Sequence, residues 1–399
     1  MTDMARPFAF QLPTRVLFGA GYLEQLPEVV AEFGSKCLLI TTREIVELGL
    51  VEQAVGYLRE KGIETIVYDG VMPDPTSGAV NKAAALAIET KPDVIVGLGG
   101  GSAMDFAKAL AIVATHEGSI WDYVGYSNRP AEEKKDVTAA TLPTIMVPTT
   151  SGTGSEVTPY SVLINSETTQ KATINSPFIR ARTALIDPEL TRSMPPQVTA
   201  GTGVDAFVHA LESFINVKNS SPFSELVAAE AMRAVPAWLP VAMENPEQME
   251  ARSNLAWASM LAGVAISHSG TTVVHALAQP LSARTGLPHS LTVAIFTPPI
   301  VKHTFAGAVE KFARIAEFIA PDQMGGLSTE QKAAQSPELI ERFLRRVGML
   351  HKISEYEAPE DIAEKLVADL YSYMSRTLDQ HPVKFNEEDL LRICTDAYS

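Results

Sequence analysis

Residues 94–105 read Val-Ile-Val-Gly-Leu-Gly-Gly-Gly-Ser-Ala-Met-Asp and pass from one kind of structure into another. The apolar run at 93–97 predicts a strand that is buried on both faces, and helical spacing begins near Ser102. Gly99, Gly100 and Gly101 lie between the two. A strand that ends in such a loop and continues into a helix indicates a parallel sheet, with ligands bound at the carboxyl ends of its strands.

The same alternation continues on both sides of this stretch. Short apolar runs predict further strands at 36–41, 64–68 and 144–148. Helical spacing fills 49–61, 76–90 and 102–115. Strands and helices in turn imply parallel pairing through right-handed crossovers. We therefore expect an α/β domain with a Rossmann-like parallel sheet over residues 1–190.

The character of the sequence changes near residues 187–195, where Asp187-Pro188 and Pro195-Pro196 act as breakers. Beyond them β-branched runs are sparse and helical spacing dominates. We expect an all-α second domain over residues 191–399. Its expected helices span 198–217, 221–238, 247–267, 271–285, 309–319, 337–347, 358–378 and 386–398.

Composition limits the possible partners. The 399 residues are 46% hydrophobic and carry a formal net charge of −15, so the chain can bury a core and lacks the basic surface that nucleic acid or an anionic membrane requires. Cys37 and Cys394 are too few for a disulfide framework, and residues 1–11 show no secretory signal pattern. Both features lead us to expect a cytoplasmic protein.

One long stretch, residues 253–283, contains no Asp, Glu, Lys or Arg. That length raises the question of a membrane span. However, the stretch contains His268, His275, Gln279 and Pro280. We interpret it as two buried helices with a break near Ser269-Gly270.

Two polar loops follow predicted strands and suggest an anion site. Glycines at 99–101 let a phosphate approach the backbone N–H groups and the positive end of the next helix, although a turn that only permits tight packing has the same pattern. In the loop at 147–157, Thr149, Thr150 and Thr153 could donate to phosphate or ribose, and a plain surface loop is the alternative. Lys171, taken alone, is typical of a solvated lysine.

A possible metal site comes from four residues of the second domain. Asp205 and His209 lie four residues apart on one helix face, and His275 and His289 follow later. One carboxylate with three imidazoles suits Fe²⁺ or Zn²⁺ and is too rich in nitrogen for Mg²⁺ or Ca²⁺. A local hydrogen bond between Asp205 and His209 is the alternative. His268 and His303 fit structural roles better.

These motifs together resemble the iron-containing (group III) alcohol dehydrogenases. The segments that carry the resemblance are 99–108, 148–158, 187–191, the helix with Asp205 and His209, and 275–289. The resemblance implies a dinucleotide-binding α/β domain and a helical domain, in the architecture of dehydroquinate synthase. It also implies Fe²⁺, or Zn²⁺ in its place, with NAD or NADP, in the interconversion of small alcohols with aldehydes or ketones.

Individual site residues can be carried over from the family. The resemblance implies Asp205, His209, His275 and His289 as metal ligands. It places the cofactor pyrophosphate on Gly100, Gly101 and Ser102, Asp105 near the nicotinamide, and Lys171 at a ribose. The full implied set of cofactor-binding residues is Thr42, Asp74, Gly99, Gly100, Gly101, Ser102, Asp105, Thr149, Thr150, Thr153, Lys171 and Leu190.

Three positions depart from the usual family pattern. Gln279 stands where many members have a histidine for proton relay or substrate handling, and glutamine cannot shuttle a proton at neutral pH. Thr42, followed by Arg43, stands where members that prefer NAD often have Asp. We therefore expect NADPH to be tolerated or preferred. Asp74 lies where many members have Asn.

Other functions on the same scaffold remain open. They include a hydroxyacid–oxoacid transhydrogenase, whose branch also lacks the extra histidine, a maleylacetate reductase and a zinc-dependent relative of glycerol dehydrogenase. A lyase of the dehydroquinate synthase type would carry Glu in place of a histidine ligand. The non-enzyme alternative is a dinucleotide-binding sensor with a degenerate metal site. The resemblance further implies a homo-oligomer, a dimer or larger.

Overall fold

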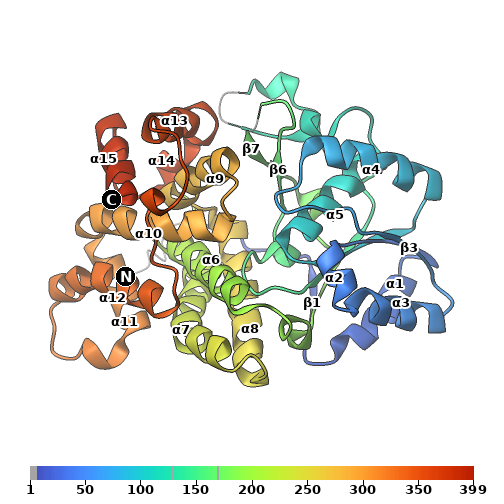
Figure 1. The fold of residues 1–399 in the computed structure, drawn as a ribbon, viewed down its shortest axis with the longest axis horizontal. Coiled ribbons are helices and arrows are strands. Elements are labelled where there is room, and N and C mark those ends of the chain that lie inside the picture. Colours follow the sequence, from blue (N-terminus) through green and yellow to red (C-terminus); the bar gives the residue numbers. More distant parts are fainter. Residues whose placement is uncertain (1–6, 127–128, 169) are drawn as a thin grey trace. The chain divides into compact units, whose positions relative to one another are not determined.

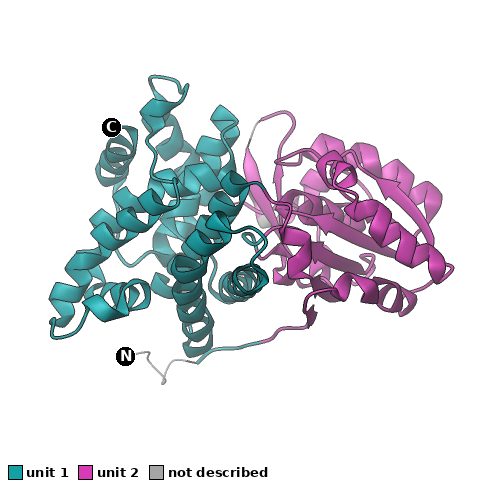
Figure 2. Cartoon of the chain, turned by 60° about the horizontal axis from the view of Figure 1, so that its bottom comes forward, with its two compact units in different colours: residues 1–10, 151–153, 195–399 teal, residues 11–150, 154–194 magenta. Residues whose placement is uncertain are grey.

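The computed structural model describes residues 7–126, 129–168 and 170–399. The start of the segment examined for a secretory signal, residues 1–6, lies outside this part. The chain forms two compact units (Figure 2): unit 1 holds Met1–Phe10, Ser151–Thr153 and Pro195–Ser399, and unit 2 holds Gln11–Thr150 and Gly154–Met194. The expected domain bounds of 1–190 and 191–399 stay a prediction.

Unit 2 is built on one parallel sheet of six strands in the order β1-β8-β5-β4-β2-β3. Figure 1 labels β1 and β3, the two edge strands of this sheet. The four predicted strands are confirmed, and two strands that the sequence did not predict, β1 and β8, complete one edge. The bounds are β1 Arg15–Phe18, β2 Lys36–Ile40, β3 Glu64–Tyr68, β4 Val94–Gly99, β5 Thr144–Pro148 and β8 Thr183–Ile186.

Helices of unit 2 pack on two hydrophobic cores, and alternate residues of the strands point into each. In β2, Leu38 and Ile40 join one core with α4 and α5, whereas Cys37 and Leu39 join the other with α1 and α3. This period of two is what a strand buried on both faces requires. The helices are α1 Leu26–Ala31, α2 Arg43–Glu47, α3 Leu50–Glu60, α4 Ser77–Thr90 and α5 Gly101–Val113.

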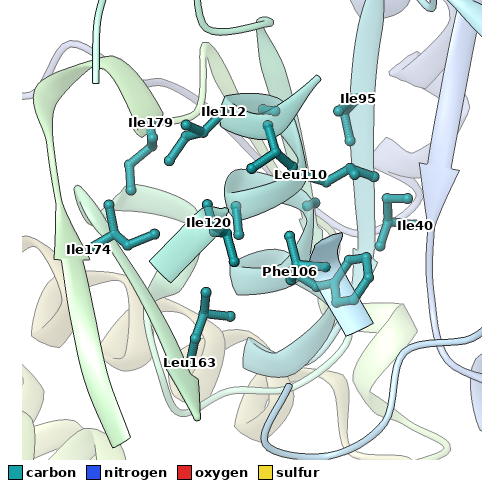
Figure 3. Packing of buried hydrophobic residues seen from close by; sticks show 14 of the residues in the cluster. Ile40, Ile95, Phe106, Leu110, Ile112, Ile120, Leu163, Ile174 and Ile179 are labelled. Carbon is teal, nitrogen blue, oxygen red and sulfur yellow. The ribbon is translucent and has the colours of Figure 1, made fainter. Parts of the chain in front are cut away.

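A separate antiparallel hairpin, β6 Tyr160–Ile164 and β7 Lys171–Asn175, lies against α5. Leu163 and Ile174 of the hairpin contribute to the same core as Phe106 and Leu110 of α5 (Figure 3). Neither strand was predicted from the sequence. Residue 169, which lies between them, is outside the described part of the chain.

The strand order determines where a ligand can bind in unit 2. Strand β2 pairs with β3 on one side and with β4 on the other, so the order of the strands reverses between β2 and β4. In open α/β sheets, ligands bind beyond the carboxyl ends of the strands at this reversal. The glycine loop follows β4 and the Thr42 turn follows β2, so both lie at this edge.

Unit 1 is helical, with α6, α7 and α8 packed on one another. Three expectations need correction. The helix expected at 337–347 begins at Thr329 and contains Pro337 in its interior. The helix expected at 358–378 is interrupted by a π-helical turn at Leu370–Met374, and a helix over 289–304 was not predicted. The bounds are α6 Pro196–Ile215, α7 Pro222–Glu244, α8 Met249–Ser269, α9 Val273–Thr285, α10 His289–Thr304, α11 Val309–Ile319, α12 Thr329–Arg346, α13 Ile362–Asp369, α14 Arg376–Gln380 and α15 Glu387–Tyr398.

The uncharged stretch at 253–283 forms two buried helices, as predicted. Helices α8 and α9 meet at an angle of 106° across a three-residue break, and the break begins at Gly270, whose φ of 76° suits glycine. Within the described residues, α7 is the only helix that is by itself long and apolar enough to cross a membrane. Half of its most apolar 18-residue stretch is buried inside the structure. Core helices of soluble proteins meet the same criterion, so this composition alone assigns no membrane span.

Candidate metal centre and cofactor loop

Helix α6 carries three ionisable side chains on one face. Asp205, His209 and Glu212 are separated by four and three residues, the spacing that places side chains on adjacent turns. All three are buried. Helix α7 packs close to this part of α6, because a Cβ on Gly203 would come within 2.6 Å of the Leu239 side chain. The face is therefore held in the interior of unit 1.

The structure brings Asp205, His275 and His289 together. One ligand atom of each lies within 4.8 Å of those of the other two. The distances from Asp205 Oδ1 are 3.5 Å to His275 Nε2 and 4.0 Å to His289 Nε2. His289 is the first residue of α10. Helices α6, α9 and α10 thus each supply one potential ligand.

His209 lies beside this group without joining it. Its Nδ1 is 3.8 Å from Asp205 Oδ2, the second oxygen of that carboxylate. Its ring stacks on His275 with centroids 4.5 Å apart and planes 15° from parallel. Its predicted role as a fourth ligand stays a prediction.

The atoms that face one another in this cluster lack hydrogen-bond partners. Glu212 accepts a hydrogen bond from His275 Nδ1, which leaves Nε2 to face Asp205 Oδ1. Within the described residues, His275 Nε2, Asp205 Oδ1 and His209 Nδ1 are all buried and without a hydrogen-bond partner. Buried polar atoms are normally satisfied. A cation between an imidazole lone pair and a carboxylate oxygen would satisfy both, so these residues fit a metal ion.

The electrostatics of the cluster also favour positive charge. Burial by itself lowers the pKa of His275, but Glu212 and Asp205 outweigh this effect and raise that pKa to about 9. Burial raises the pKa of Asp205, yet His209, His275 and His289 together hold it well below its usual range. Burial lowers the pKa of His209. The cluster therefore holds an ionised carboxylate that attracts either a proton or a metal ion.

Gln279 lies one helical turn beyond His275 on α9. It is buried, and its Oε1 has no hydrogen-bond partner within the described part of the chain. Spacing of four residues places the amide on the same face of α9 as His275. An amide at this point can exchange hydrogen bonds but cannot carry a proton at neutral pH.

The glycine loop of unit 2 has the geometry of an anion cradle. Gly99 has a φ of +152°, and a Cβ there would lie 2.8 Å from Ala103. Gly100 is the N-cap of α5, which therefore starts at Gly101, one residue before the expected Ser102. No side chain at positions 99–101 blocks the backbone N–H groups of the first turn of α5. An anion can approach them there.

Strand β5 ends beside the same loop. The Thr149 N–H donates to the Gly99 carbonyl at 3.0 Å. The Thr149 hydroxyl is buried and, among the described residues, has no hydrogen-bond partner. Thr150 lies over Gly100, since a Cβ on this glycine would be 3.3 Å from the threonine methyl group. Both predicted threonines are therefore next to the glycine loop, whereas Thr153 belongs to unit 1.

Lys171 is buried. The sequence around it, taken alone, had indicated a solvated lysine, and that interpretation is wrong. Lys171 begins β7, and its Nζ lies 2.6 Å from Asp74 Oδ1. Asp74 adopts the left-handed conformation with φ 52°, and its N–H donates to Ser102 Oγ at 3.3 Å. Asp74, Ser102 and Lys171 therefore lie in one connected group at the start of α5.

Asp105 is joined to the hairpin. It accepts hydrogen bonds from Ser155 Oγ at 2.6 Å and Val162 N at 2.9 Å. One turn later, the fully buried Lys108 donates to the carbonyl of Tyr160 and to Ser155, and burial lowers its pKa to about 8. Lys108 was not among the residues predicted from the sequence. A lysine on an otherwise apolar face of α5 was the available signal.

The last two predicted cofactor residues follow different strands, Thr42 after β2 and Leu190 after β8, and each of these strands is next to an edge strand. Thr42 is the N-cap of α2, directly after β2, and its hydroxyl helps to lower the pKa of Glu44. Leu190 is buried in the short 3₁₀ turn Pro188–Thr191 and packs in the core shared with α1 and α3. Their contacts with a cofactor stay predictions.

Comparison with known proteins gives a consistent result. The family model described as iron-containing alcohol dehydrogenase matches residues 13–188, and the model for the C-terminal part of that family matches 199–398. Long-chain-alcohol dehydrogenase 1 of Geobacillus thermodenitrificans is 37% identical over 96% of this chain and 94% of its own length. The 1,3-propanediol dehydrogenase of Klebsiella pneumoniae is 32% identical over 98% of this chain and 99% of its own length.

Solved structures show the same likeness. The alcohol dehydrogenase of an archaeal halo-thermophile from a Red Sea brine pool superimposes with a TM-score of 0.93 at 31% identity, covering 99% of this chain and all of that one. Sequence and fold agree over nearly the whole length. The chain is a member of the iron-containing alcohol dehydrogenase family, an enzyme family that acts on alcohols.

Proposed function

We propose that this protein is a metal-dependent, NAD(P)-linked alcohol dehydrogenase or aldehyde reductase. It would transfer a hydride between nicotinamide C4 and the carbon of a small alcohol or carbonyl compound. The observation that carries the proposal is the buried, unsatisfied pair of Asp205 Oδ1 and His275 Nε2, with His289 beside it. The family relationship supplies the reaction class.

Within this proposal, Asp205, His275 and His289 hold Fe²⁺, or Zn²⁺ in its place, and His209 is the fourth ligand. When bound, such an ion supplies Lewis acidity toward a substrate oxygen. The three imidazoles and one carboxylate leave a net positive centre for that purpose. Gln279, next to the ligands on α9, can orient a substrate through hydrogen bonds. The alcohol proton therefore leaves through water, a ribose hydroxyl or another residue.

The dinucleotide binds unit 2 in this proposal. The backbone N–H groups at Gly100, Gly101 and Ser102, with the positive end of α5, hold its pyrophosphate. The unsatisfied Thr149 hydroxyl and the buried Lys171 supply further donors for phosphate or ribose. The remaining members of the implied set, Asp105 among them, are part of the same proposal.

The histidine on α9 offers a direct test. We expect His275→Ala to lose the bound metal and nearly all turnover, while unit 2 still binds dinucleotide. Metal content by mass spectrometry and quenching of protein fluorescence by NADH measure the two properties separately. A variant that kept its activity after complete removal of the metal would contradict the proposal.

The nucleotide preference is a second prediction. Thr42 and Arg43 follow β2 in place of an acidic residue that would repel a 2′-phosphate, so we expect NADPH to be accepted at least as well as NADH. Steady-state kinetics with both cofactors on an anaerobic, iron-reconstituted enzyme measure this, over a panel of aldehydes. A kcat/KM ratio for NADH over NADPH well above 100 would refute it.

The remaining parts of the proposal concern partners and location. We propose a small alcohol or aldehyde as the substrate, a homo-oligomer of two or more chains, and a cytoplasmic location without nucleic-acid or membrane partners. The net charge of −15 supports the exclusion of nucleic acid.

Gln279 favours one second candidate, a hydroxyacid–oxoacid transhydrogenase, because that branch of the family also lacks the histidine. Such an enzyme keeps its cofactor bound and needs two organic substrates. Steady oxidation of free NADH or NADPH by a single aldehyde would exclude it. Turnover that requires both a hydroxyacid and an oxoacid would favour it.

A further inference from the structure

Glu212 is a fully buried carboxylate on α6 that lies outside the predicted ligand set. Its Oε1 accepts hydrogen bonds from Thr272 N at 3.0 Å, Thr272 Oγ1 at 2.7 Å and Val274 N at 2.8 Å. Its Oε2 accepts from His275 Nδ1. One oxygen therefore binds the first N–H groups of α9, and the other binds the ligand histidine on the same helix.

The hydrogen bonds of Glu212 determine which nitrogen of His275 faces the cluster. Three hydrogen-bond donors, Thr272 N, Thr272 Oγ1 and Val274 N, converge on one oxygen of Glu212, the environment that suits an ionised carboxylate. An ionised carboxylate can only accept, so His275 must present Nδ1–H toward it. His275 Nε2 is then the atom directed at Asp205 Oδ1, 3.5 Å away.

We propose that Glu212 is a positioning residue for the metal site: it holds His275 in the orientation and tautomer that ligate through Nε2. The inference rests on the proposed metal site. Metal-bound histidines commonly donate their other ring N–H to a carboxylate, which raises ligand basicity and orients the ring. Here the same carboxylate is fixed by three further donors at the start of α9, so the histidine and its helix are aligned together.

A second layer of contacts supports Glu212 from behind. Thr272 Oγ1 lies 3.1 Å from His381 Nδ1, and His381 Nε2 lies 2.9 Å from Thr304 Oγ1. Thr272, His381 and Thr304 are all fully buried. This chain of side chains connects α10 and the segment after α14 to the Glu212 carboxylate. It limits the positions that the carboxylate can take.

Replacement of Glu212 by glutamine distinguishes a role in positioning His275 from a role that only fills space in the core. Three donors face one end of the side chain at 212, so an amide must turn its oxygen toward them. Its NH₂ group then faces His275 Nδ1 and requires a lone pair there. His275 would carry its proton on Nε2, the atom that must bind the metal. Glu212→Ala leaves a cavity, but it does not force His275 into either tautomer.

The test is a titration of metal-free full-length protein with Co²⁺, read by its visible absorption and by competition with a chelator. We expect Glu212→Ala to bind Co²⁺ about tenfold more weakly than the wild type and Glu212→Gln about 100-fold more weakly. Thermal unfolding of the metal-free proteins should give the opposite order, with alanine less stable than glutamine. A merely structural role would move stability and affinity in the same order.

A matched control is Glu225→Gln on α7, which alters another buried carboxylate of unit 1 that pairs with Lys311. It should destabilise the protein and leave Co²⁺ affinity unchanged. Equal affinity for wild type and Glu212→Gln, or tighter binding by glutamine than by alanine, would overturn the inference. Failure of the wild type itself to bind Co²⁺ would overturn the proposed metal site instead.

A second variant keeps the inference testable if Glu212→Gln does not fold. Thr272→Val preserves the side-chain shape and removes the hydroxyl that donates a hydrogen bond to Glu212 Oε1. We expect its Co²⁺ affinity to fall several-fold, with the shape of the Co²⁺ absorption bands altered. Unchanged affinity and an unchanged spectrum would count against Glu212 as the positioning residue.

Discussion

His381 is a neutral histidine in a fully buried position, and it predicts how stability depends on pH. Burial lowers its pKa to about 4, against 6.5 for a free histidine, with Glu212 opposing and Lys384 reinforcing the shift. The unfolded chain therefore binds more protons between these values. Stability is retained above pH 6.5 and is lost as the pH falls toward 4, by on the order of 3 kcal/mol.

The variant His381→Gln removes this titration. It should be less stable than the wild type at pH 7, and the difference between the two should narrow steadily between pH 6.5 and 4. Urea unfolding at several pH values measures the free energies. A difference that stays constant over this range would show that His381 does not carry the dependence.

Single side chains show how far sequence could locate the site. The spacing of Asp205 and His209 revealed a polar face on a buried helix, and the structure adds His275 and His289 to Asp205. Glu212 was missed, although it lies two turns after Asp205 on that face and has no Lys or Arg within four residues in the sequence. The contacts that define its role come from residues 272–275, about 60 positions away, and no local pattern could supply them.

Strand β4 contains a glycine whose replacement should destabilise unit 2. A Cβ on Gly97 would lie 2.8 Å from Met146 Sδ and 3.3 Å from Met104 Cα, so the strand and α5 would have to separate. We expect Gly97→Ala to cost about 1–3 kcal/mol. The matched control is Gly56→Ala in α3, where a Cβ meets nothing within 4 Å.

Gly56→Ala should stabilise the protein by up to about 1 kcal/mol, because alanine favours the helix and loses less backbone entropy. Urea unfolding followed by circular dichroism compares the two variants. Equal stability of Gly97→Ala and the wild type would mean that the strand and helix tolerate the extra methyl group.

Secondary-structure elements were predictable where one local pattern dominated. The four predicted strands are apolar runs, and all four lie where they were expected, although β3 is an edge strand and is partly exposed. Helix α10 was missed, and it contains Pro298 and Pro299, residues that normally disrupt a helix interior. The hairpin was missed because β6 and β7 are five residues each and stabilise each other by pairing and by packing on α5, which are non-local effects.

Removal of the metal should lower the stability of the whole protein. A ligand that binds only the folded state adds about 2.7 kcal/mol at 100 times its dissociation constant. We expect protein whose metal has been removed by a chelator to unfold at a lower urea concentration than protein reloaded with Zn²⁺. His275→Ala should show no such difference. Equal midpoints for stripped and reloaded wild type would argue against the site.

Unit 1 is discontinuous in sequence, and this limits how the protein can be divided or recombined. A gene fragment that begins at residue 195 would encode every proposed ligand, yet it would lack Ser151–Thr153, which belong to the same unit. Gly152 in that short piece packs on Thr202 of α6, and its backbone helps to raise the pKa of His209 against the effect of burial. The helical segment that carries the proposed ligands therefore cannot be moved into another protein on its own. Chimaeras between relatives should take residues 151–153 and the helical segment from the same parent.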